Sequence, residues 1–429
     1  MRKIFVYGLF LASFSTSFAQ DGNTIWKRGK GVEKNPYLLE TKEQFFYLAQ
    51  QVNNGNPYEN TYFEMTNDID LQCSSSNAWQ PIGTESAPFK GFFNGKNFSL
   101  SGLLVNNLSL NYAGLFGFIY MGKVENIRIV NSSFSANDYV GAVIGYLMGG
   151  EIYNCYNESF VSGRNNVGGI VGYAHSVKMN TCANRGNIIG ILYVGGIVGV
   201  GYGNMVVSNS YNRSKVSGYQ YVGGVAGKLE GAAKKAILKN CYQEDVFCRI
   251  GVLGSATLTL VENCYYADVS GIGAFSEGTK ISYKEMKTSD FVSLLNQNYN
   301  LWKKDAELSV NSGYPILKSI AYKGIITNEA TNVVYSSATL NGSILPDVKG
   351  TVIRKGFEFW EDGATDTIRF FVLTNPLYYS VKDLKPSQQY SFRIIVISSI
   401  QTLYGDIQQF QTLPPPHKCG TDCNLPHNH

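Results

Sequence analysis

Histidine is scarce in this chain, and its scarcity limits the chemistry that the protein could perform. The 429 residues include 4 His, and His175 is the one that precedes the C-terminal tail. A zinc protease site of the His-Glu-x-x-His type needs two imidazoles on one helical face, and a serine hydrolase of the triad type needs a His base. We therefore expect neither kind of active site, and we expect no metal ion or other cofactor.

Carboxylates are the second group of residues that could support catalysis. Glycoside hydrolysis needs two of them facing each other about 5–9.5 Å apart. Within residues 112–228 the acids are Glu125, Asp138, Glu151 and Glu158. These acids do not recur at equivalent positions of the repeat described below, and no Lys or Arg base stands beside a calcium-binding acidic cluster. We predict that the chain is not an enzyme; a carbohydrate-active enzyme with a site assembled from non-consecutive coils stays an alternative.

Aromatic residues recur with a regularity that the acids lack. One residue stands immediately before each Val-Gly or Ala-Gly pair, and these residues are Tyr112, Tyr139, Asn166, Tyr193 and Tyr221. In a stack of coils they would align, as would the shorter row Phe118, Tyr146 and Tyr173. Such a row, if exposed, could bind glycans through its tyrosines, whereas aromatic stacks in sheets commonly serve packing alone. The sequence favours the packing interpretation and leaves glycan binding at the four tyrosines as a hypothesis.

Four cysteines share one repeat position: Cys155, Cys182, Cys241 and Cys264, with Ser210 at the same position between them. The Ser indicates a slot for any small side chain, so we predict buried thiols with a packing role. Neighbouring coils are close enough for disulfides, and Cys155–Cys182 and Cys241–Cys264 are the pairs that could form. In the tail, Cys419 and Cys423 could pair with each other or bind a metal adventitiously.

A repeat organises these residues. Five Gly-rich segments end at Gly117, Gly145, Gly172, Gly199 and Gly227, at intervals of 27 or 28 residues. A second motif keeps the same period between them, as in Asn154-Cys-Tyr-Asn157 and Asn209-Ser-Tyr-Asn212. Gly and β-branched residues dominate and no helical stripe is present, which argues against an α-solenoid; a sandwich of hairpins would not need so long a period. The pattern predicts an all-β parallel β-solenoid with one coil per repeat.

The Gly-rich segments resemble a known repeat. Gly114-Leu-Phe-Gly117 and Gly168-Gly-Ile-Val-Gly172 are similar to the GLUG motif of bacterial surface proteins. The preceding stretches Trp79-Gln-Pro-Ile-Gly83 and Leu100-Ser-Gly-Leu103 resemble the lead-in of such proteins. The resemblance covers roughly residues 29–320 and implies a right-handed β-helix on an exported protein. Some proteins with this repeat are metalloproteases that cut immunoglobulin, a possibility that the scarcity of His argues against.

Short helices are expected at both ends of the solenoid. Thr41-Lys-Glu-Gln44 fits a capping box, and Phe45, Leu48, Ala49 and Val52 follow at helical spacing, so we predict a helix over residues 42–53 that covers the first coil. A second helix near Asp290–Gln297 would cover the last coil. Such covers protect the strand edges at the ends of a stack from aggregation.

A different module begins near Ile325. Alternating segments separated by turn residues predict a β-sandwich with strands over Ser337–Leu345, Val352–Trp360, Thr367–Leu373, Tyr378–Leu384, Tyr390–Ile397 and Gln408–Thr412. Leu384-Lys-Pro-Ser-Gln-Gln-Tyr390 resembles the tyrosine-corner segment of fibronectin type III domains. We expect a signal peptide over residues 1–19, the β-helix domain over 20–320, the fibronectin type III-like domain over 325–413 and a disordered tail over 414–429.

The expected export signal and the low charge limit the classes of function that the chain could have. Arg2 and Lys3, the apolar stretch Ile4–Ala12 and Ser17-Phe18-Ala19 form the three regions of a secretory signal. The formal net charge of +4 on a chain with 16% charged residues gives no footprint for nucleic acid, and membrane insertion is not expected. The predicted function is that of a bacterial adhesin or binding protein at the cell surface or outside the cell, with the periplasm left open. Glycans or the surface proteins of a host or neighbouring cell would be its partners, and a structural or display role without a ligand is the alternative.

Overall fold

The computed structural model describes residues 25–244, 251–267, 277–297, 300–305, 311, 313–319, 325–344, 348, 351–362, 364, 366–374, 377–399, 402–405 and 408–415. The expected signal peptide and the tail beyond Pro415 lie outside the described residues. The expected pairing of Cys419 with Cys423 lies there as well.

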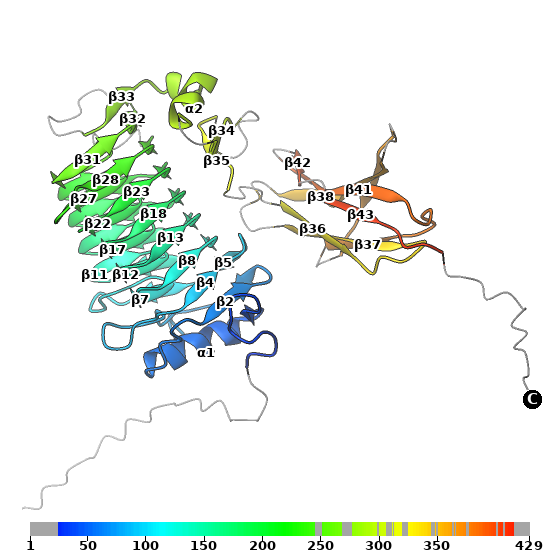
Figure 1. Ribbon diagram of the computed structural model, residues 1–429, viewed down its shortest axis with the longest axis horizontal. Coiled ribbons are helices and arrows are strands. Elements are labelled where there is room, and N and C mark those ends of the chain that lie inside the picture. Colours follow the sequence, from blue (N-terminus) through cyan, green and yellow to red (C-terminus); the bar gives the residue numbers. More distant parts are fainter. Residues whose placement is uncertain are drawn as a thin grey trace, which may run out of the picture.

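The larger part of the chain is a parallel β-solenoid of about 8 turns, in which each full turn passes through five short strands (Figure 1). Equivalent strands of successive turns pair in register and build five parallel sheets, here called sheets A to E. The chain passes through them in the order E, A, B, C, D and then E of the next turn. The predicted fold class is confirmed.

The strands of each sheet follow in the order in which they pair. Sheet A contains β1 Tyr37–Leu39, β2 Tyr62–Met65, β4 Phe92–Asn94, β8 Lys123–Glu125, β13 Glu151–Tyr153, β18 Lys178–Asn180, β23 Val206–Ser208, β28 Ala236–Lys239 and β31 Thr259–Glu262. Sheet B contains β3 Ile69–Asp70, β5 Ser99–Ser101, β9 Arg128–Ile129, β14 Tyr156–Asn157, β19 Ala183–Asn184, β24 Tyr211–Asn212, β29 Tyr242–Gln243, β32 Tyr265–Ala267 and β33 Thr279–Ile281. Sheet C contains β6 Leu104–Asn106, β10 Ser133–Ser135, β15 Phe160–Ser162, β20 Ile188–Ile189 and β25 Val216–Ser217. Sheet D contains β11 Asp138–Gly141, β16 Asn165–Gly168, β21 Leu192–Gly195 and β26 Gln220–Gly223. Sheet E contains β7 Phe116–Tyr120, β12 Ile144–Met148, β17 Val171–His175, β22 Val198–Tyr202, β27 Ala226–Glu230 and β30 Ala256–Thr257.

The sequence repeat corresponds to the structural coil. Gly141, Gly168, Gly195 and Gly223 are direct partners across sheet D, although they are 27 or 28 residues apart in the chain. Stacking places the apolar residues of every coil in one continuous core, which includes Ile144, Val171 and Val198. A single coil could not bury these side chains, so the repeats stabilise one another by contact with their neighbours.

The N-terminal end is covered as expected. Helix α1 spans Lys42–Asn53, and Phe45, Leu48, Ala49 and Val52 are buried in the solenoid core. The Gln44 side chain accepts hydrogen bonds from the backbone N–H groups of Thr41 (3.1 Å) and Glu40 (2.6 Å). These bonds supply the side-chain half of the predicted capping box, and the helix has the predicted bounds.

A helix also lies at the C-terminal end of the solenoid (Figure 1). Helix α2, Ser289–Leu295, forms after the short helix η1, Glu285–Lys287, but its buried residues Phe291 and Leu295 do not join the solenoid core. They pack against the outward rings of sheet B, with Phe291 5.9 Å from Tyr242 and 5.1 Å from Tyr265 between ring centroids. The prediction of a helix here is confirmed, and α2 contacts the last coil from the outer face of sheet B, through Tyr265 and through a 2.8 Å hydrogen bond from the Asn263 amide to Leu294 O. The outward tyrosines of sheet B form an apolar surface of their own, and α2 covers that surface.

We call the described residues from 282 to 319 the flap, because they follow β33 and pack against the outward rings of sheet B. It ends in the antiparallel pair β34, Trp302–Lys303, and β35, Ile316–Leu317. Trp302 is buried with its ring 5.9 Å from that of Tyr211 and 5.6 Å from that of Tyr242. The flap therefore uses aromatic contacts to cover a row of tyrosines on the solenoid.

The C-terminal region folds into two antiparallel sheets (Figure 1). The strands of the first are β36 Ile325–Thr331, β37 Ala338–Ile344 and β40 Leu377–Val381, and those of the second are β39 Ile368–Phe371, β38 Val352–Glu361, β41 Gln389–Ser398, β42 Thr402–Tyr404 and β43 Gln408–Gln411. All six predicted strands are present, whereas β36 and β42 were not predicted. The Lys385 N–H donates to the Tyr390 hydroxyl at 2.9 Å, which is the predicted tyrosine corner.

Candidate functional site: a lateral aromatic surface

One corner of the solenoid repeats a strained backbone conformation. In five successive coils, the chain has a residue with φ between 55° and 65° where it enters sheet D. These residues are Tyr112, Tyr139, Asn166, Tyr193 and Tyr221. We call these five residues the tyrosine row. The left-handed conformation costs about 1–2 kcal/mol for most residues, and Asn adopts it more readily than Tyr does. Four of the five coils therefore hold a tyrosine where an asparagine would cause less strain.

The rings of the tyrosine row stack on one another along the solenoid axis. The centroids of Tyr112 and Tyr139 are 5.0 Å apart with their planes 10° from parallel. Tyr193 and Tyr221 form the same arrangement at 5.0 Å and 8°. Asn166 separates the two pairs, so the row consists of two stacked pairs with a polar residue between them.

A second row lies beside the first on the outer face of sheet E. It contains Phe118, Tyr146, Tyr173, Val200 and Lys228, which are register partners in β7, β12, β17, β22 and β27. We call it the neighbouring row, and the two rows together form the lateral aromatic surface. Its rings stack at 4.6 Å from Phe118 to Tyr146 and at 4.7 Å from Tyr146 to Tyr173.

The two rows meet at steep angles. The planes of Tyr139 and Tyr146 are 70° apart at a centroid distance of 5.5 Å, and those of Tyr112 and Phe118 are 73° apart at 5.4 Å. The 5.0 Å between stacked centroids of the tyrosine row is close to the ~4.8 Å that separates paired strands, so these rings follow the spacing of the coils.

The lateral aromatic surface lies on the outside of the solenoid. Tyr112, Tyr139, Tyr193, Tyr146 and Tyr173 are half-buried, and Tyr221 is 37% exposed. The rings therefore stack from coil to coil and are also partly exposed at the outer surface.

The last glycine of each repeat positions the tyrosine row. A Cβ added at Gly172 would lie 2.6 Å from the carbonyl carbon of Tyr139 and 2.5 Å from the backbone nitrogen of Val140. Cβ atoms do not approach backbone atoms so closely, so only glycine lets the two chain segments meet here. The motif that reveals the repeat in the sequence is therefore also the one that holds the tyrosine corner against the next coil.

Polar side chains border the tyrosine row. The Asn165 backbone N–H and side-chain amide both donate to Asp138 Oδ1, at 3.1 and 3.0 Å. The Asn137 amide donates to Asn111 Oδ1 at 3.0 Å. These four residues stand one or two positions before Tyr112, Tyr139 and Asn166, so amide and carboxylate groups border the first three positions of the row, whereas Leu192 stands before Tyr193.

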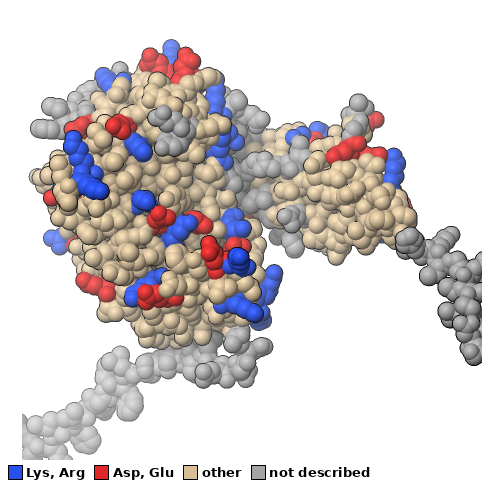
Figure 2. All heavy atoms as spheres, viewed as in Figure 1, with Lys and Arg blue, Asp and Glu red and all other residues tan. Residues whose placement is uncertain are grey.

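Charged groups at the two ends of the surface are paired. The Tyr112 hydroxyl donates to Glu85 Oε2 at 3.1 Å. At the other end, Lys228 Nζ lies 5.6 Å from the centroid of the Tyr193 ring and forms an ion pair with Glu230 at 2.6 Å. Figure 2 shows charges of both signs in small mixed groups on the face that it presents.

Burial makes several of these phenols weaker acids than a free tyrosine side chain. It raises the pKa of Tyr112 to about 12, and the hydrogen bond to Glu85 acts in the same direction. It raises the pKa of Tyr173 to about 12, with a smaller contribution from Tyr146, and it also raises the pKa of Tyr146. The hydroxyls of Tyr112, Tyr146 and Tyr173 are therefore neutral hydrogen-bonding groups at physiological pH.

The four carboxylates considered in the sequence are distributed over three of the five sheets. Glu125 and Glu151 lie in sheet A, where Lys123 forms a 2.6 Å ion pair with Glu125 and is the register partner of Glu151. Glu158 follows β14 of sheet B, and Asp138 begins β11 of sheet D. Among the described residues, no group of three or more His, Cys, Asp or Glu side chains could hold a metal ion.

The four cysteines of the repeat are buried and unbonded. Cys155, Cys182, Cys241 and Cys264 are free thiols, each at most 2% exposed. Each sulfur donates to the carbonyl oxygen two residues earlier, as Cys155 does to Tyr153 O at 3.2 Å, and Ser210 Oγ makes the same bond to Ser208 O at 2.8 Å. This shared bond explains why Cys and Ser can exchange in the slot. The structure contains neither of the two disulfides that the spacing allows.

A row of amides inside the solenoid was not predicted. Asn157, Asn184 and Asn212 are fully buried, and each donates to the next or to the backbone. Asn184 donates to Asn212 Oδ1 and Gly186 O, both at 2.8 Å, and accepts from Asn157 Nδ2 at 2.8 Å and from the Gly186 N–H at 3.2 Å. All four of its hydrogen-bonding positions are used, so this row is a structural element and has no group left for a ligand.

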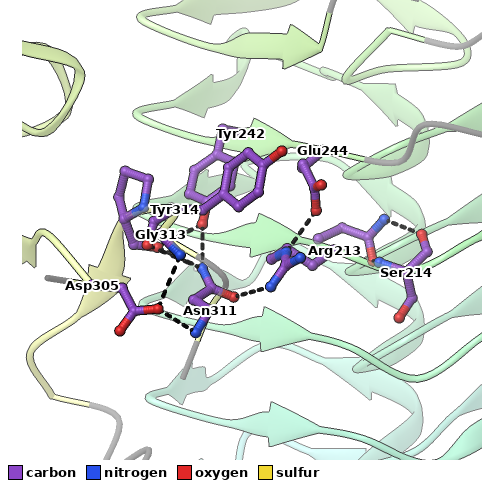
Figure 3. Close-up of polar contacts among 10 residues, drawn as sticks. Arg213, Ser214, Tyr242, Glu244, Asp305, Asn311, Gly313 and Tyr314 are labelled. Carbon is purple, nitrogen blue, oxygen red and sulfur yellow. Dashed lines mark hydrogen bonds and ion pairs between the residues drawn. The ribbon is translucent and has the colours of Figure 1, made fainter. Parts of the chain in front are cut away.

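A second buried network fixes the flap to the solenoid (Figure 3). Asn311 donates to the Tyr242 hydroxyl at 3.0 Å and to Pro315 O at 2.8 Å, and accepts from Arg213 Nη1 at 3.0 Å. Arg213 also donates to Glu244 at 2.6 Å. Asp305 accepts from the backbone N–H groups of Asn311 and Gly313 at 2.7 and 3.1 Å. Because these groups bind one another, the network is a structural contact.

Several residues of the lateral aromatic surface and its border were not identified in the sequence. Glu85 lies in the loop before β4, and Lys228 and Glu230 replace the aromatic and apolar residues of earlier coils. Register counting from Phe118 through Tyr146 and Tyr173 would have reached Lys228. Nothing in the repeat indicates that Glu85 contacts Tyr112.

The chain has similarity to two curated proteins over part of its length. No protein-family model matches it, so the assignment to the GLUG repeat stays a prediction. A stretch of 139 residues, 31% of this chain and 15% of the relative, is 31% identical to a Gly-rich membrane protein of Evansella cellulosilytica. A stretch of 124 residues, 27% of this chain and 1% of the relative, is 28% identical to halomucin of Haloquadratum walsbyi. The chain thus spans a small part of the curated relatives that it matches, and the similarity is consistent with a surface or binding protein.

The solved structures match a smaller part of the chain than these two curated proteins do. A sensor domain of an anti-sigma factor from Pseudobacteroides cellulosolvens is 24% identical, with 21% of this chain and 94% of that chain covered, at a TM-score of 0.18. A fibronectin type III domain of a human protein is 20% identical, with 23% of this chain and 91% of that chain covered, at the same TM-score. Within the described part of the chain, no helix combines the length and the apolar character needed to cross a membrane.

Proposed function

We propose that the protein is an exported binding protein of the bacterial surface, resembling GLUG-repeat proteins, and that its lateral aromatic surface binds glycans. The observation that carries this proposal is the left-handed backbone of Tyr112, Tyr139, Tyr193 and Tyr221. Strained backbone conformations persist where the surrounding structure enforces them, and they cluster at functional sites. The equivalent Asn166 demonstrates that the coil accepts a residue with less strain at this corner.

The chemistry of the surface suits a sugar. The exposed parts of these rings can pack against the C–H groups of a pyranose, which are apolar, as rings do with other apolar groups. The Asn and Asp side chains beside the rings offer donors and acceptors to hydroxyl groups. The flap network and the amide row inside the solenoid have their polar groups occupied within the chain, so they support no competing ligand site.

The proposal is tested by binding of the full chain to a glycan array, followed by titration of the glycans that it retains. Tyr193→Asn and Tyr221→Asn remove a ring and keep a residue type that adopts the left-handed backbone, as Asn166 does. Loss of one ring is expected to weaken binding by about two- to tenfold, the equivalent of the ~0.5–1.5 kcal/mol of an aromatic contact. Tyr335→Asn, at an exposed tyrosine of the C-terminal region, is the matched control.

Binding that responds equally to Tyr221→Asn and to Tyr335→Asn would place the glycan elsewhere and remove the lateral aromatic surface as its site. A chain that retains no glycan on the array would favour a display role without a ligand. Circular dichroism of each variant excludes unfolding as the cause of a loss.

A further inference from the structure

The lateral aromatic surface has a direction, and this direction restricts the ligand. The tyrosine row runs parallel to the solenoid axis over five coils, from Tyr112 to Tyr221. Coils that pair as parallel strands are separated by ~4.8 Å, so the row is about 19 Å long. Across the axis the surface is two residues wide, because the tyrosine row meets the neighbouring row on one side and polar residues such as Asp138 and Asn165 on the other.

From this geometry we infer that the ligand class is a linear, neutral polysaccharide that lies along the solenoid axis and spans several coils. The inference rests on the proposed function and makes it more specific. Consecutive sugars of an extended chain advance by a length comparable with the spacing of the coils. A chain laid along the row would therefore meet a ring at four of the five coils, with Asn111, Asp138 or Gln220 directly before the ring in three of them and Leu192 before Tyr193. A compact or branched glycan would contact one coil or two and leave the remaining rings without a ligand.

The charges at the surface favour a neutral polymer. The Lys228 ammonium is paired with Glu230 at 2.6 Å, the Asp138 carboxylate accepts two hydrogen bonds from Asn165, and Glu85 accepts from the Tyr112 hydroxyl. A polyanion would have to compete with Glu230 for Lys228 and would approach the carboxylates of Glu85 and Asp138. Arg164, exposed and two residues before Asn166, is the further cation to consider, and the experiment below includes a polyanion for this reason.

Asn166 has a particular place in this arrangement. The coils on either side carry Tyr139 and Tyr193, and these two are separated by two coil spacings, ~9.6 Å. Asn166 occupies the equivalent position in the coil between them, so neither Tyr139 nor Tyr193 has a ring of the tyrosine row next to it on that side. A polysaccharide lying along the row would cross this interruption, with one sugar bound by amides of Asn165 and Asn166 in place of a ring.

The experiment is a titration of the full chain with unbranched β-1,4-linked glucose oligomers and N-acetylglucosamine oligomers, from the dimer to the octamer. The affinity for at least one series is expected to rise with each added sugar and to level off once the oligomer is as long as the row. Oligomers of galacturonic acid, which carry a negative charge on each sugar, are expected to bind at least tenfold more weakly than the neutral oligomer of equal length.

Asn166→Tyr tests the interruption directly. It completes the row with a fifth ring at a position whose left-handed backbone accepts tyrosine in the other four coils. We expect about two- to tenfold tighter binding of oligomers that span position 166, from the ~0.5–1.5 kcal/mol of one aromatic contact, and no change for the dimer. Asn332→Tyr is the matched control, since Asn332 is an exposed asparagine with a φ of 50° in the C-terminal region.

The outcomes separate this inference from the proposed function. Binding of neutral oligomers whose affinity does not depend on length, or which Asn166→Tyr leaves unchanged at every length, would overturn the axial arrangement and leave glycan binding intact. Tighter binding of the polyanion would overturn the neutral class. Binding of other glycans on the array, but of no oligomer in either neutral series, would contradict the linear class, and a chain that binds no saccharide at all would contradict the proposed function itself.

Discussion

The backbone of Gly172 lies directly against that of Tyr139 in the preceding coil: a Cβ at position 172 would be 2.6 Å from the Tyr139 carbonyl carbon. This contact joins the motif that defines the repeat to the residue that defines the surface. It also makes the tyrosine row sensitive to changes at a position that has no side chain of its own.

Gly172→Ala is therefore expected to lower the free energy of unfolding by about 3 kcal/mol, because the new Cβ meets only backbone atoms, which cannot move aside as a side chain can. Displacement of the corner should also change the near-ultraviolet circular dichroism of the stacked tyrosines. Gly55→Ala is the control: nothing lies within 4 Å of its Cβ, although its φ of 101° adds some strain. An unchanged tyrosine signal in Gly172→Ala would contradict the proposed link between the glycine and the row.

Asn184→Leu tests the amide row inside the solenoid. The change keeps the approximate volume of the side chain and leaves partners in Asn157, Asn212 and Gly186 without their hydrogen bonds. Buried polar groups that lose their partners cost about 1–3 kcal/mol each, so chemical denaturation should reveal a loss of at least ~2 kcal/mol. Asn111→Leu, at an exposed asparagine, should cost much less, and equal losses in the two variants would mean that the buried amides do not stabilise the stack.

The raised pKa values predict how the protein responds to alkali. Tyrosine ordinarily ionises near pH 10, whereas the pKa of Tyr112 and of Tyr173 is about 12 in the folded chain. Between about pH 10 and pH 12 the unfolded chain releases these phenolic protons while the folded chain retains them. The contribution of the two phenols to the free energy of unfolding is therefore complete below about pH 10 and is lost as the pH rises toward about 12. Unfolding free energies measured from pH 9 to 12 should decline, and Tyr112→Phe should make the decline less steep. A variant with the same slope as the parent chain would argue against burial of that phenol.

The thiols of the repeat should be unreactive in the native state. Burial raises the pKa of Cys155 and Cys241, with a contribution from the neighbouring Cys182 and Cys264 respectively, and the thiolate is the reactive form. Alkylation followed by peptide mass spectrometry, without reductant, should leave all four unmodified in buffer and modify all four in denaturant. Peptides linked through Cys155 and Cys182, or through Cys241 and Cys264, would contradict this and establish the disulfide alternative for the exported protein.

The sequence predicts the parts of this structure that repeat. The glycine spacing determines the coil, and the Thr41 to Gln44 pattern determines α1, because both depend on residues close together in the chain or at a constant period. The six predicted strands of the C-terminal region were recognisable by alternation, whereas β36 lacks a clear alternation and β42 has three residues.

The remaining features depend on contacts between distant segments. The position of α2 depends on Tyr242 and Tyr265 facing outward, and the contact of Glu85 with Tyr112 depends on how a loop lies over the first coils. The amide row appeared in the sequence as part of a corner motif, and only the stacking of coils places Asn157, Asn184 and Asn212 inside. For the lateral aromatic surface, the sequence identified the tyrosines and left open whether they are exposed.

The central claim, that the lateral aromatic surface is the binding site, is tested most directly by hydroxyl-radical footprinting of the full chain with and without the cello-oligosaccharide or chito-oligosaccharide hexamer. Peptide mass spectrometry would measure oxidation at Tyr139, Tyr193 and Tyr221 and at the reference tyrosines Tyr335 and Tyr378 of the C-terminal region. The account predicts that a saturating hexamer protects the first three and leaves the two reference residues unchanged. Equal protection of both sets, or protection of the reference residues alone, would contradict it.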